Sequence, residues 1–485
     1  MRGGGWRHRL GDRVVRRPRE RELQPVHIRT HRRHRFPLPT ATAALLSLTV
    51  SFAGLISIGT VLLMLPVASA QGAGAPLITA LFTATSATCV TGLVVVSSAH
   101  YWSGFGQAVI ALLMFLGGLG IMVAGLVILT IMGRRISLNQ RLVVREAMGA
   151  HSLGSVVRVG RLVVLFAVAA QTAGFLLLFA RLAFKYDVGQ AAWQSLFHSV
   201  SAFNNAGFVI FPDSDSLSAF QSDHLVLWAI GALIVLGALS FPVVNEVARR
   251  LRPNRWTLDT RLVVVGTLGL WVVGGLAFAV FETANPATLG GLSVIGKISN
   301  GAFQALTSRT AGFSSVDFAQ TTDGTDALYM LLMFIGGASG SVAGGIKINT
   351  VMVLIVVALA SIRGRTRPEL FKRELPYAQV ARALALLLLA LAALMGFVVA
   401  LAGTESASID AGRFSFADVV FEAVSAFGTT GLSRGVTPDL SDPGKLVVTL
   451  AMYAGRLGPL TIALGLALGE RRGLYRYARE RVRIG

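Results

Sequence analysis

Long apolar stretches recur along the whole chain and predict membrane-spanning helices. Eight of them hold about 20 or more mostly apolar residues, which is enough to cross a hydrocarbon core of ~30 Å. They lie near residues 42–65, 106–133, 159–184, 224–248, 261–282, 327–362, 378–402 and 445–469. We therefore predict an all-α integral membrane protein with eight transmembrane helices.

A shorter apolar stretch lies between the two members of each pair of spans. These stretches are too short to cross a bilayer and are found near residues 76–88, 191–203, 295–307 and 416–428. Irregular backbone is tolerated at membrane depth only where protein buries it or where it lines a water-filled cavity. We therefore predict four half-helices that enter the membrane, turn back and line a pore.

Each predicted half-helix leads into a similar glycine motif. The motif glycines are Gly92, Gly207, Gly312 and Gly431, spaced by 115 (207−92), 105 (312−207) and 119 (431−312) residues. This regular spacing indicates four tandem helix–half-helix–helix units, at about residues 41–135, 155–250, 258–363 and 376–470. A ring of four such loops can turn carbonyl oxygens toward a common axis and replace the water around a dehydrated cation.

Composition agrees with a membrane protein and argues against an enzyme. Hydrophobic residues make up 53% of the 485 residues and charged residues only 14%, and the mean hydropathy is +0.65, values too apolar for an ordinary soluble protein. The single cysteine, Cys89, excludes an intramolecular disulfide and a thiolate metal cluster. A near match to a phosphate-binding loop at 291–298 has Ile298 where magnesium binding needs Ser or Thr.

The net charge of +20 follows the predicted membrane topology, so it does not indicate nucleic-acid binding. Basic residues gather in residues 1–40, in the links near 134–145, 249–255 and 363–373, and in residues 471–485. By the positive-inside rule, both basic tails are cytoplasmic and all four half-helices enter from outside a cell membrane. The N-terminal tail is a candidate for contact with anionic membrane lipid or a cytosolic partner.

The second span of the third unit is interrupted by a run of small residues. Five glycines and two serines lie between Ile335 and Lys347, and each glycine disfavours a helix by about 1 kcal/mol. A close contact between two helices would also explain some of these small residues. The run is denser than such a contact needs, so we expect a broken or partly unwound segment.

An arginine lies about halfway along the last predicted span. An arginine at this depth costs roughly 2.5–3.5 kcal/mol on insertion scales, so Arg456 should face water, a carboxylate or exposed carbonyls. As a hypothesis, it projects into the pore, holds the glycine-rich segment by hydrogen bonds and raises a barrier to cations. Glu422 and Arg309 lie near the motif glycines, and we expect both to brace the loops rather than to bind an ion.

Together the four motifs resemble the Trk/Ktr/HKT superfamily of potassium transporters, and most closely its Ktr-type membrane subunit. The resemblance covers about residues 40–470 and rests on TATSATCVTGL (83–93), AFNNAGF (202–208), TSRTAGF (307–313) and FEAVSAFGTTGLS (421–433). It implies a pseudo-fourfold pore in which filter carbonyls bind K+. The implied filter residues are Val90, Thr91, Gly92, Asn205, Ala206, Gly207, Thr310, Ala311, Gly312, Thr429, Thr430 and Gly431.

The resemblance also implies a gate and partners. The implied gate is an intramembrane loop with Arg456 beside it, and its loop residues are Gly336, Gly337, Ala338, Ser339, Gly340, Ser341, Gly344, Gly345 and Lys347. Relatives of this type form homodimers regulated by a cytosolic nucleotide-binding ring. They have no covalent cofactor, and sodium is a candidate activator.

Two other functions remain open from the sequence. A secondary transporter of another solute also uses discontinuous helices near the membrane midplane, although such folds usually show two repeats rather than four. A sodium-conducting member of the same superfamily is the second alternative. In the superfamily a serine in place of the first filter glycine goes with sodium preference, whereas all four positions here are glycine, which favours potassium.

Overall fold

The computed structural model describes residues 40–131, 156–214, 216–365 and 367–468, and side chains for 49–120, 160–214, 216–365 and 367–457. The predicted basic tails, before residue 40 and at 471–485, and the basic link at 134–145 lie outside the described residues. Everything below concerns the described part of the chain.

Within the described residues, the first two predicted units contain seven α-helices and two 3-10 helices. The first unit holds α1 (Thr40–Met64), the 3-10 helix η1 (Pro66–Ala68), α2 (Leu77–Cys89) and α3 (Gly104–Ile131). The second holds α5 (Val156–Leu182), α6 (Val188–Phe203), the 3-10 helix η3 (Ser218–Phe220), α7 (His224–Ala238) and α8 (Phe241–Arg249).

The last two units follow the same order, with a small β-hairpin between them. The third unit holds η4 (Pro253–Arg255), α9 (Leu258–Glu282), α10 (Val294–Thr307), η5 (Phe318–Gln320), α11 (Asp323–Phe334) and α12 (Ile348–Ile362). In the hairpin, β1 (Glu369–Leu370) pairs antiparallel with β2 (Arg373–Glu374), and Glu369 lies opposite Glu374. The fourth unit holds α13 (Tyr377–Thr404), α14 (Ser406–Asp410), α15 (Phe416–Gly428), η6 (Thr437–Asp439) and α16 (Asp442–Leu468).

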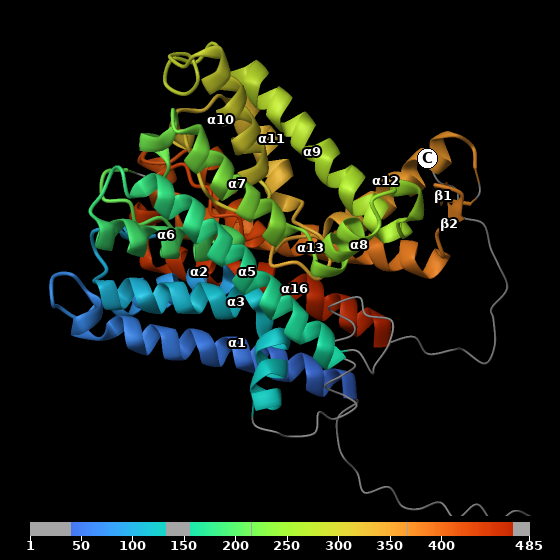
Figure 1. The fold of residues 1–485 in the computed structure, drawn as a ribbon, viewed down its shortest axis with the longest axis horizontal. Coiled ribbons are helices and arrows are strands. Elements are labelled where there is room, and N and C mark those ends of the chain that lie inside the picture. Colours follow the sequence, from blue (N-terminus) through green and yellow to red (C-terminus); the bar gives the residue numbers. More distant parts are fainter. Residues whose placement is uncertain (1–39, 132–155, 215, 366, 469–485) are drawn as a thin grey trace, which may run out of the picture. The chain divides into compact units, whose positions relative to one another are not determined.

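All four predicted half-helices are helices, namely α2, α6, α10 and α15 (Figure 1). α2, α6 and α15 each pack against both longer helices of their own units, and α10 packs against α9. The second long helix of each unit also packs against the half-helix of the next, as α3 against α6, α7 against α10, α11 against α15 and α16 against α2. Because the last of these contacts returns to the first unit, the four units form a closed cycle around the ends of the half-helices.

The half-helices are anchored in the core by phenylalanines. Phe82, Phe197, Phe303 and Phe421 are each almost fully buried. Phe82, Phe197 and Phe421 lie ten residues before the motif glycine of their unit, and Phe303 lies nine before it. A buried phenylalanine removes a large apolar area from solvent. The shared register therefore gives each half-helix a similar seat in the fold.

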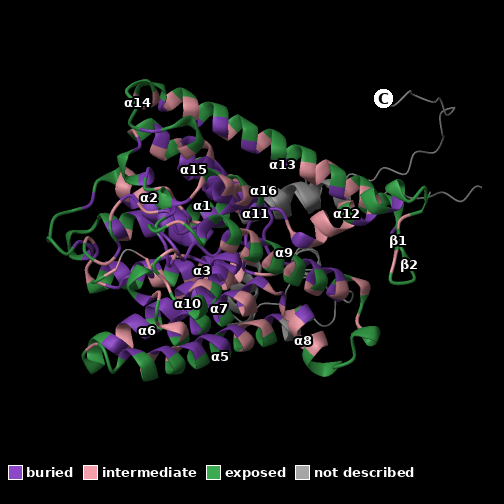
Figure 2. Ribbon diagram, turned by 90° about the horizontal axis from the view of Figure 1, so that it is seen from above, coloured by how far each residue is buried: buried purple, intermediate pink, exposed green. Residues whose placement is uncertain are grey.

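Three helices are long and apolar enough to cross a membrane by length and composition, at Gly160–Leu182, Leu258–Glu282 and Tyr377–Thr404. Among the described residues a fourth candidate span is the bent pair of α7 and α8. Much of α5 and α13 is exposed (Figure 2), and α9 and α13 expose apolar side chains such as Val272, Leu276, Leu388 and Met395. Such surfaces suit a hydrocarbon environment, while the predicted total of eight spans stays a prediction.

Two predicted spans are not the continuous helices we expected. The span predicted at 106–133 is interrupted at Gly120, whose φ of 73° and ψ of 155° are non-helical. The span predicted at 224–248 bends by 102° between α7 and α8, where Leu239 and Ser240 are extended and Pro242 lacks an N–H for a continuing helix. The predicted break at 327–362 is present, because α11 ends at Phe334 and α12 begins at Ile348.

Three glycines of the second long helices allow close packing on the half-helices, and the sequence analysis missed them. A methyl group added to Gly117, Gly237 or Gly455 would clash with the carbonyl oxygen of Thr88, Phe203 or Phe427, respectively. Each of these carbonyls belongs to the residue four before its motif glycine. The repeated contact brings the second helix of three units directly onto the backbone that leads into the motif.

Replacing Gly455 with valine should destabilise the protein, because the added side chain meets the Phe427 backbone and overpacking costs about 1–3 kcal/mol. Thermal unfolding of the detergent-solubilised protein measures the effect as a lower Tm. Gly396→Val in α13 is the matched control, since nothing lies within 4 Å of a Cβ added there. Equal Tm values for the two variants would contradict the close contact.

Candidate functional site

The four motif loops have the same unusual backbone conformation. The residue two before each motif glycine is left-handed, with φ of 56° at Val90, 56° at Asn205, 64° at Thr310 and 52° at Thr429. The motif glycines also have positive φ, of 95°, 70°, 75° and 88° in chain order. Left-handed non-glycine residues cost energy and persist only where the surroundings hold them, so the four loops are tightly constrained.

A serine six residues before the glycine holds the first and fourth loops. In the first loop, Ser86 O accepts from Thr91 N at 2.8 Å and Ser86 Oγ accepts from Gly92 N at 3.1 Å. In the fourth loop, Ser425 O accepts from Thr430 N at 2.9 Å and Ser425 Oγ accepts from Gly431 N at 3.0 Å. In each of these two units one serine thus accepts from two loop N–H groups, with its carbonyl, which is among the last of the helix, and with its hydroxyl.

The second and third loops vary this arrangement. Ser201 O accepts from Ala206 N at 2.8 Å, but its hydroxyl donates onward to Phe208 O at 2.8 Å. The third unit has Leu306 in the serine position. There Thr307 O accepts from Ala311 N at 3.1 Å and from Gly312 N at 3.4 Å. The third loop therefore turns without a side-chain acceptor for its glycine.

The four loops meet in a closed ring. A Cβ added at Gly92 would lie 2.5 Å from Ala206 O, and one added at Gly207 would lie 2.9 Å from Ala311 O. One at Gly312 would clash with Thr430 O, and one at Gly431 with Thr91 O. Each motif glycine thus touches the carbonyl of the next loop. The fold thus brings together eight of the twelve predicted filter residues, namely the four glycines with Thr91, Ala206, Ala311 and Thr430; Val90, Asn205, Thr310 and Thr429 precede them in the same loops.

Several buried polar side chains beside the ring lack partners within the described chain. They are the hydroxyls of Thr91, Thr310 and Thr429 and both amide atoms of Asn205. A buried polar group left without a hydrogen bond costs about 1–3 kcal/mol. The oxygens among these groups are therefore suited to water or a cation, and the amide nitrogen of Asn205 to water.

One side of the ring opens into a cavity of about 590 Å³. All four motif glycines line it, together with seven serines: Ser97, Ser98, Ser214, Ser216, Ser218, Ser314 and Ser433. Among the described lining residues, Asp317 is the one with a charged side chain. The cavity thus offers hydroxyl groups and one carboxylate, a lining suited to a hydrated cation.

The glycine-rich segment between α11 and α12 folds back on itself. Gly336 N donates to Ile346 O at 2.8 Å, and Ile346 N donates to Phe334 O at 3.3 Å. These bonds pair the two ends of the segment in parallel, at Ile335 and Ile346. The segment, residues 335–347, is therefore a closed loop rather than an extended link, and we refer to it as the glycine loop.

The end of α7 provides acceptors for the glycine loop. Ala338 N donates to Ala238 O at 3.0 Å, and Val342 N donates to Gly237 O at 3.2 Å. The last carbonyls of a helix have no partner within the helix. Because α7 stops at Ala238, its terminal carbonyls are free to bind the loop.

Three basic side chains donate to glycine-loop carbonyls. Arg456 Nη1 donates to Val342 O, while its Nη2 donates to Gly117 O of α3 at 2.7 Å. Lys347 Nζ donates to Ala343 O, so it anchors the loop to itself. Arg309 Nη2, from the third motif loop, donates to Gly336 O at 3.1 Å. Arg456 therefore joins α16, the glycine loop and α3.

The glycine loop lies directly against the fourth motif loop. A Cβ added at Gly344 would clash with the side chain of Thr429. Thr430 Oγ1 also donates to Met333 O near the end of α11, at 3.4 Å. The predicted gate residues and the predicted filter residues are thus in contact.

In the second and fourth units, the side chain nine residues before the glycine accepts a hydrogen bond from the loop after the glycine. We call such a side chain a brace. Glu422 Oε1 accepts from Arg434 N at 3.2 Å, and its Oε2 accepts from Thr437 Oγ1 at 2.8 Å. In the second unit, His198 Nε2 is 3.2 Å from Ile210 N, which places the ring nitrogen as acceptor. Both braced N–H groups lie three residues after the glycine. The sequence analysis identified Glu422 as a brace but missed His198, although their shared offset was a usable signal.

Replacing His198 with phenylalanine should lower the stability of the protein, because the buried Ile210 N–H then loses its acceptor, at a cost of about 1–3 kcal/mol. Thermal unfolding measures the loss as a reduced Tm. His100→Phe serves as the control, since the His100 contact with Ser97 is exposed. An unchanged Tm for His198→Phe would show that the brace is not needed.

Comparison with a family model and curated proteins adds to this geometry. The TrkH family model, described as a cation transport protein, matches residues 24–470. The Ktr system potassium uptake protein B of Bacillus subtilis is 39% identical over 87% of this chain and 93% of its own length. The protein of the same name from Vibrio alginolyticus is 38% identical over 87% and 90%. The potassium/sodium uptake protein NtpJ of Enterococcus hirae is 36% identical over 89% and 95%.

A solved structure has the same fold. The crystal structure of the potassium transporter TrkH from Vibrio parahaemolyticus matches with a TM-score of 0.66 and 20% identity, over 89% of this chain and 86% of that chain. At this identity the likeness establishes the architecture alone.

Proposed function

The chain belongs to the TrkH family of cation transport proteins, which are integral membrane transporters and not enzymes, and we propose that it takes up potassium across the cell membrane. The observation that carries this proposal is the closed ring of four loops, in which each motif glycine touches the carbonyl of the next loop. A potassium filter replaces the water of a dehydrated ion with backbone carbonyls.

In this proposal the twelve predicted filter residues form the selectivity filter. Thr91, Ala206, Ala311 and Thr430 contribute the carbonyls that lie beside the glycines. The unpartnered hydroxyls near the ring and the serine-lined cavity support passage of a hydrated cation to and from it. The membrane potential supplies the driving force, since one elementary charge gains ~2.3 kcal/mol per 100 mV.

The glycine loop acts as the gate in this proposal. It packs against Thr429 of the fourth motif loop and is held by hydrogen bonds rather than by large side chains. Small residues let such a loop shift without repacking the core. Arg456 is the proposed lock, because its guanidinium holds the loop and α3 together.

The proposal extends to partners and orientation. We infer a homodimer whose cytoplasmic side binds a nucleotide-binding regulatory ring, in agreement with the word "system" in the names of two relatives. We propose that both termini and the basic tails are cytoplasmic, near anionic lipid. The name of the Enterococcus relative, a potassium/sodium uptake protein, supports sodium as an activator or, as a second candidate function, as a transported ion.

Uptake of rubidium or potassium into liposomes that contain the purified protein tests the proposed function, with sodium and lithium as competitors. Selective potassium uptake is the expected result. Equal sodium uptake would favour the sodium-conducting alternative. Absence of ion flux, with and without the regulatory ring, would overturn the proposal in favour of transport of another solute.

Replacing Gly312 with serine should reduce the ratio of potassium to sodium uptake about tenfold, equivalent to ~1.4 kcal/mol. The side chain would enter the space that Thr430 O occupies beside Gly312 and displace that carbonyl. Competition uptake in liposomes measures the ratio. Gly291→Ser is the control, because a Cβ there meets open space. An unaltered ratio in Gly312→Ser would remove this glycine from the filter.

Replacing Arg456 with glutamine should raise potassium uptake several-fold, because the glycine loop then loses a charged donor that ties it to α3. The initial uptake rate per folded protein is the measurement. Lys445→Gln, near the start of the same helix, is the control. Unchanged uptake by a folded Arg456→Gln protein would count against the lock.

A further inference from the structure

The fourth motif loop has a charged side chain just after its glycine, at a position where the other three loops have none. Arg434 lies three residues after Gly431, where the other loops have Val95, Ile210 and Ser315. The main chain of Arg434 is already held, because its N–H donates to Glu422. The question is what its side chain adds to an already braced loop.

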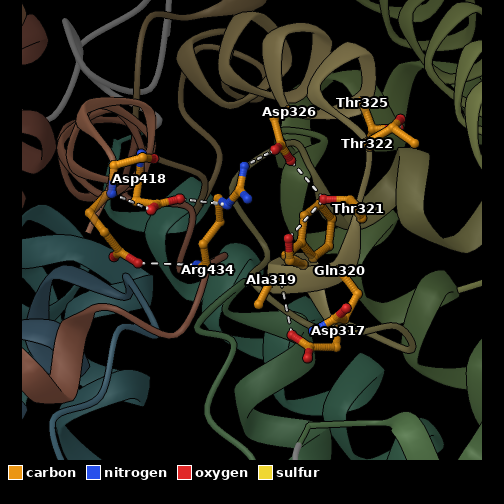
Figure 3. Close-up of polar contacts among 12 residues, drawn as sticks. Asp317, Ala319, Gln320, Thr321, Thr322, Thr325, Asp326, Asp418 and Arg434 are labelled. Carbon is orange, nitrogen blue, oxygen red and sulfur yellow. Dashed lines mark hydrogen bonds and ion pairs between the residues drawn. The ribbon is translucent and has the colours of Figure 1, made fainter. Parts of the chain in front are cut away.

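The Arg434 side chain bridges two units (Figure 3). Its Nη1 pairs with Asp326 Oδ2 on α11, in the third unit, and its Nε lies 2.9 Å from Asp418 Oδ1 on α15, in the fourth. The side chains of Arg434, Asp326 and Asp418 are 17%, 5% and 17% exposed. We call these three residues the clamp.

Both carboxylates of the clamp are fixed in place by their other oxygen. Asp326 Oδ1 accepts from Thr321 Oγ1 at 2.7 Å, as Figure 3 shows. Asp418 Oδ2 accepts from Ser415 N at 2.8 Å, as part of the capping box that begins α15. The arginine therefore lies between two pre-oriented carboxylates: it donates to Asp326 and forms an ion pair with Asp418 without a hydrogen bond between Nε and Oδ1.

Burial makes this ion pair stronger than a surface pair. Charges removed from water interact more strongly and are screened less by salt. Removal of one partner from such a pair leaves an uncompensated charge. None of the described residues that line the cavity could take the place of the Arg434 charge. Asp317 is the charged residue among them, and its carboxylate accepts from Ala319 N at 2.9 Å.

The clamp acts on one edge of the ring. Arg434 is three residues from Gly431, and Thr430 O is the carbonyl that lies beside Gly312 of the third loop. Helix α11 thus touches the fourth loop at both of its ends, through Asp326 near its start and Met333 near its end. A shift of Arg434 relative to α11 would therefore change the distance between the third and fourth loops.

We propose that the clamp determines ion specificity by fixing the fourth loop relative to the third. Arg434 is a positioning residue, since its side chain is not among those that line the cavity. This inference rests on the proposed potassium uptake through the ring. Discrimination between potassium and sodium depends on the number and placement of coordinating carbonyls. If the fourth loop is held less firmly against the third, the ring should admit sodium more readily.

Arg434→Gln should lower the ratio of potassium to sodium uptake in liposomes at least several-fold, and Asp326→Asn should do the same. Arg434→Lys should retain part of the ratio, because the charge remains and the bridging geometry is lost. The double variant Arg434→Gln/Asp326→Asn should lose less than the sum of the two single effects, because both act on one contact.

Arg181→Gln is the matched control. It removes an ion pair between Arg181 and Asp223, at 2.8 Å, whose arginine is 47% exposed and which joins the end of α5 to the start of α7. The ratio should stay unchanged in this variant. If Arg434→Gln does not fold, Asp326→Asn carries the test, with Tm measured for both.

Each outcome separates the clamp from the proposed function. Wild-type selectivity with an unchanged ratio in folded Arg434→Gln and Asp326→Asn would overturn the clamp alone. An equal loss in Arg181→Gln would also overturn it, because the effect would then be general. Absence of selective potassium uptake by the wild type would overturn the proposed function and the clamp with it.

Discussion

Backbone groups that leave a helix inside a membrane must find partners in the protein, since no water is available in the hydrocarbon. The rest of this structure depends on that constraint. The motif loops satisfy their N–H groups with Ser86 and Ser425, and the glycine loop satisfies the carbonyls left where α7 ends. Some of the buried polar side chains left without partners in the described chain belong to the motif loops, namely Thr91, Asn205, Thr310 and Thr429. At these loops an ion or water could complete the missing contacts.

The four units share a plan, but their differences carry the proposed mechanism. The ring uses equivalent residues from all four units, as a fourfold filter requires. The second long helices do not match, because three are interrupted and α16 continues through Arg456. Only the third interruption is long enough to form the glycine loop. A nearly symmetric frame therefore holds an asymmetric glycine loop, which is the gate in the proposed mechanism.

Four basic side chains in the described core are held in two distinct ways. Arg309, Lys347 and Arg456 all donate to carbonyls of the glycine loop. Their partners are dipoles, so the loop is held by directional bonds that a small movement breaks. Arg434 is instead paired with two carboxylates, which makes a stiffer contact. The first arrangement suits a part that moves, and the second suits a part that must stay in place.

The sequence by itself determined the half-helices to within three residues at either end, the motif glycines and the interruption after α11, because apolar length and glycine content are local properties. It did not determine the breaks at Gly120 and Leu239, because a helix can tolerate a single glycine or proline. A break also needs neighbouring elements that provide hydrogen-bond partners for the backbone groups it releases. Tertiary structure also decided that Arg456 reaches Gly117, 339 residues away, that His198 mirrors Glu422, and that Arg434 meets Asp326. Such contacts join side chains whose separation along the chain carries no information about their distance in space, so only packing of the four units could specify them.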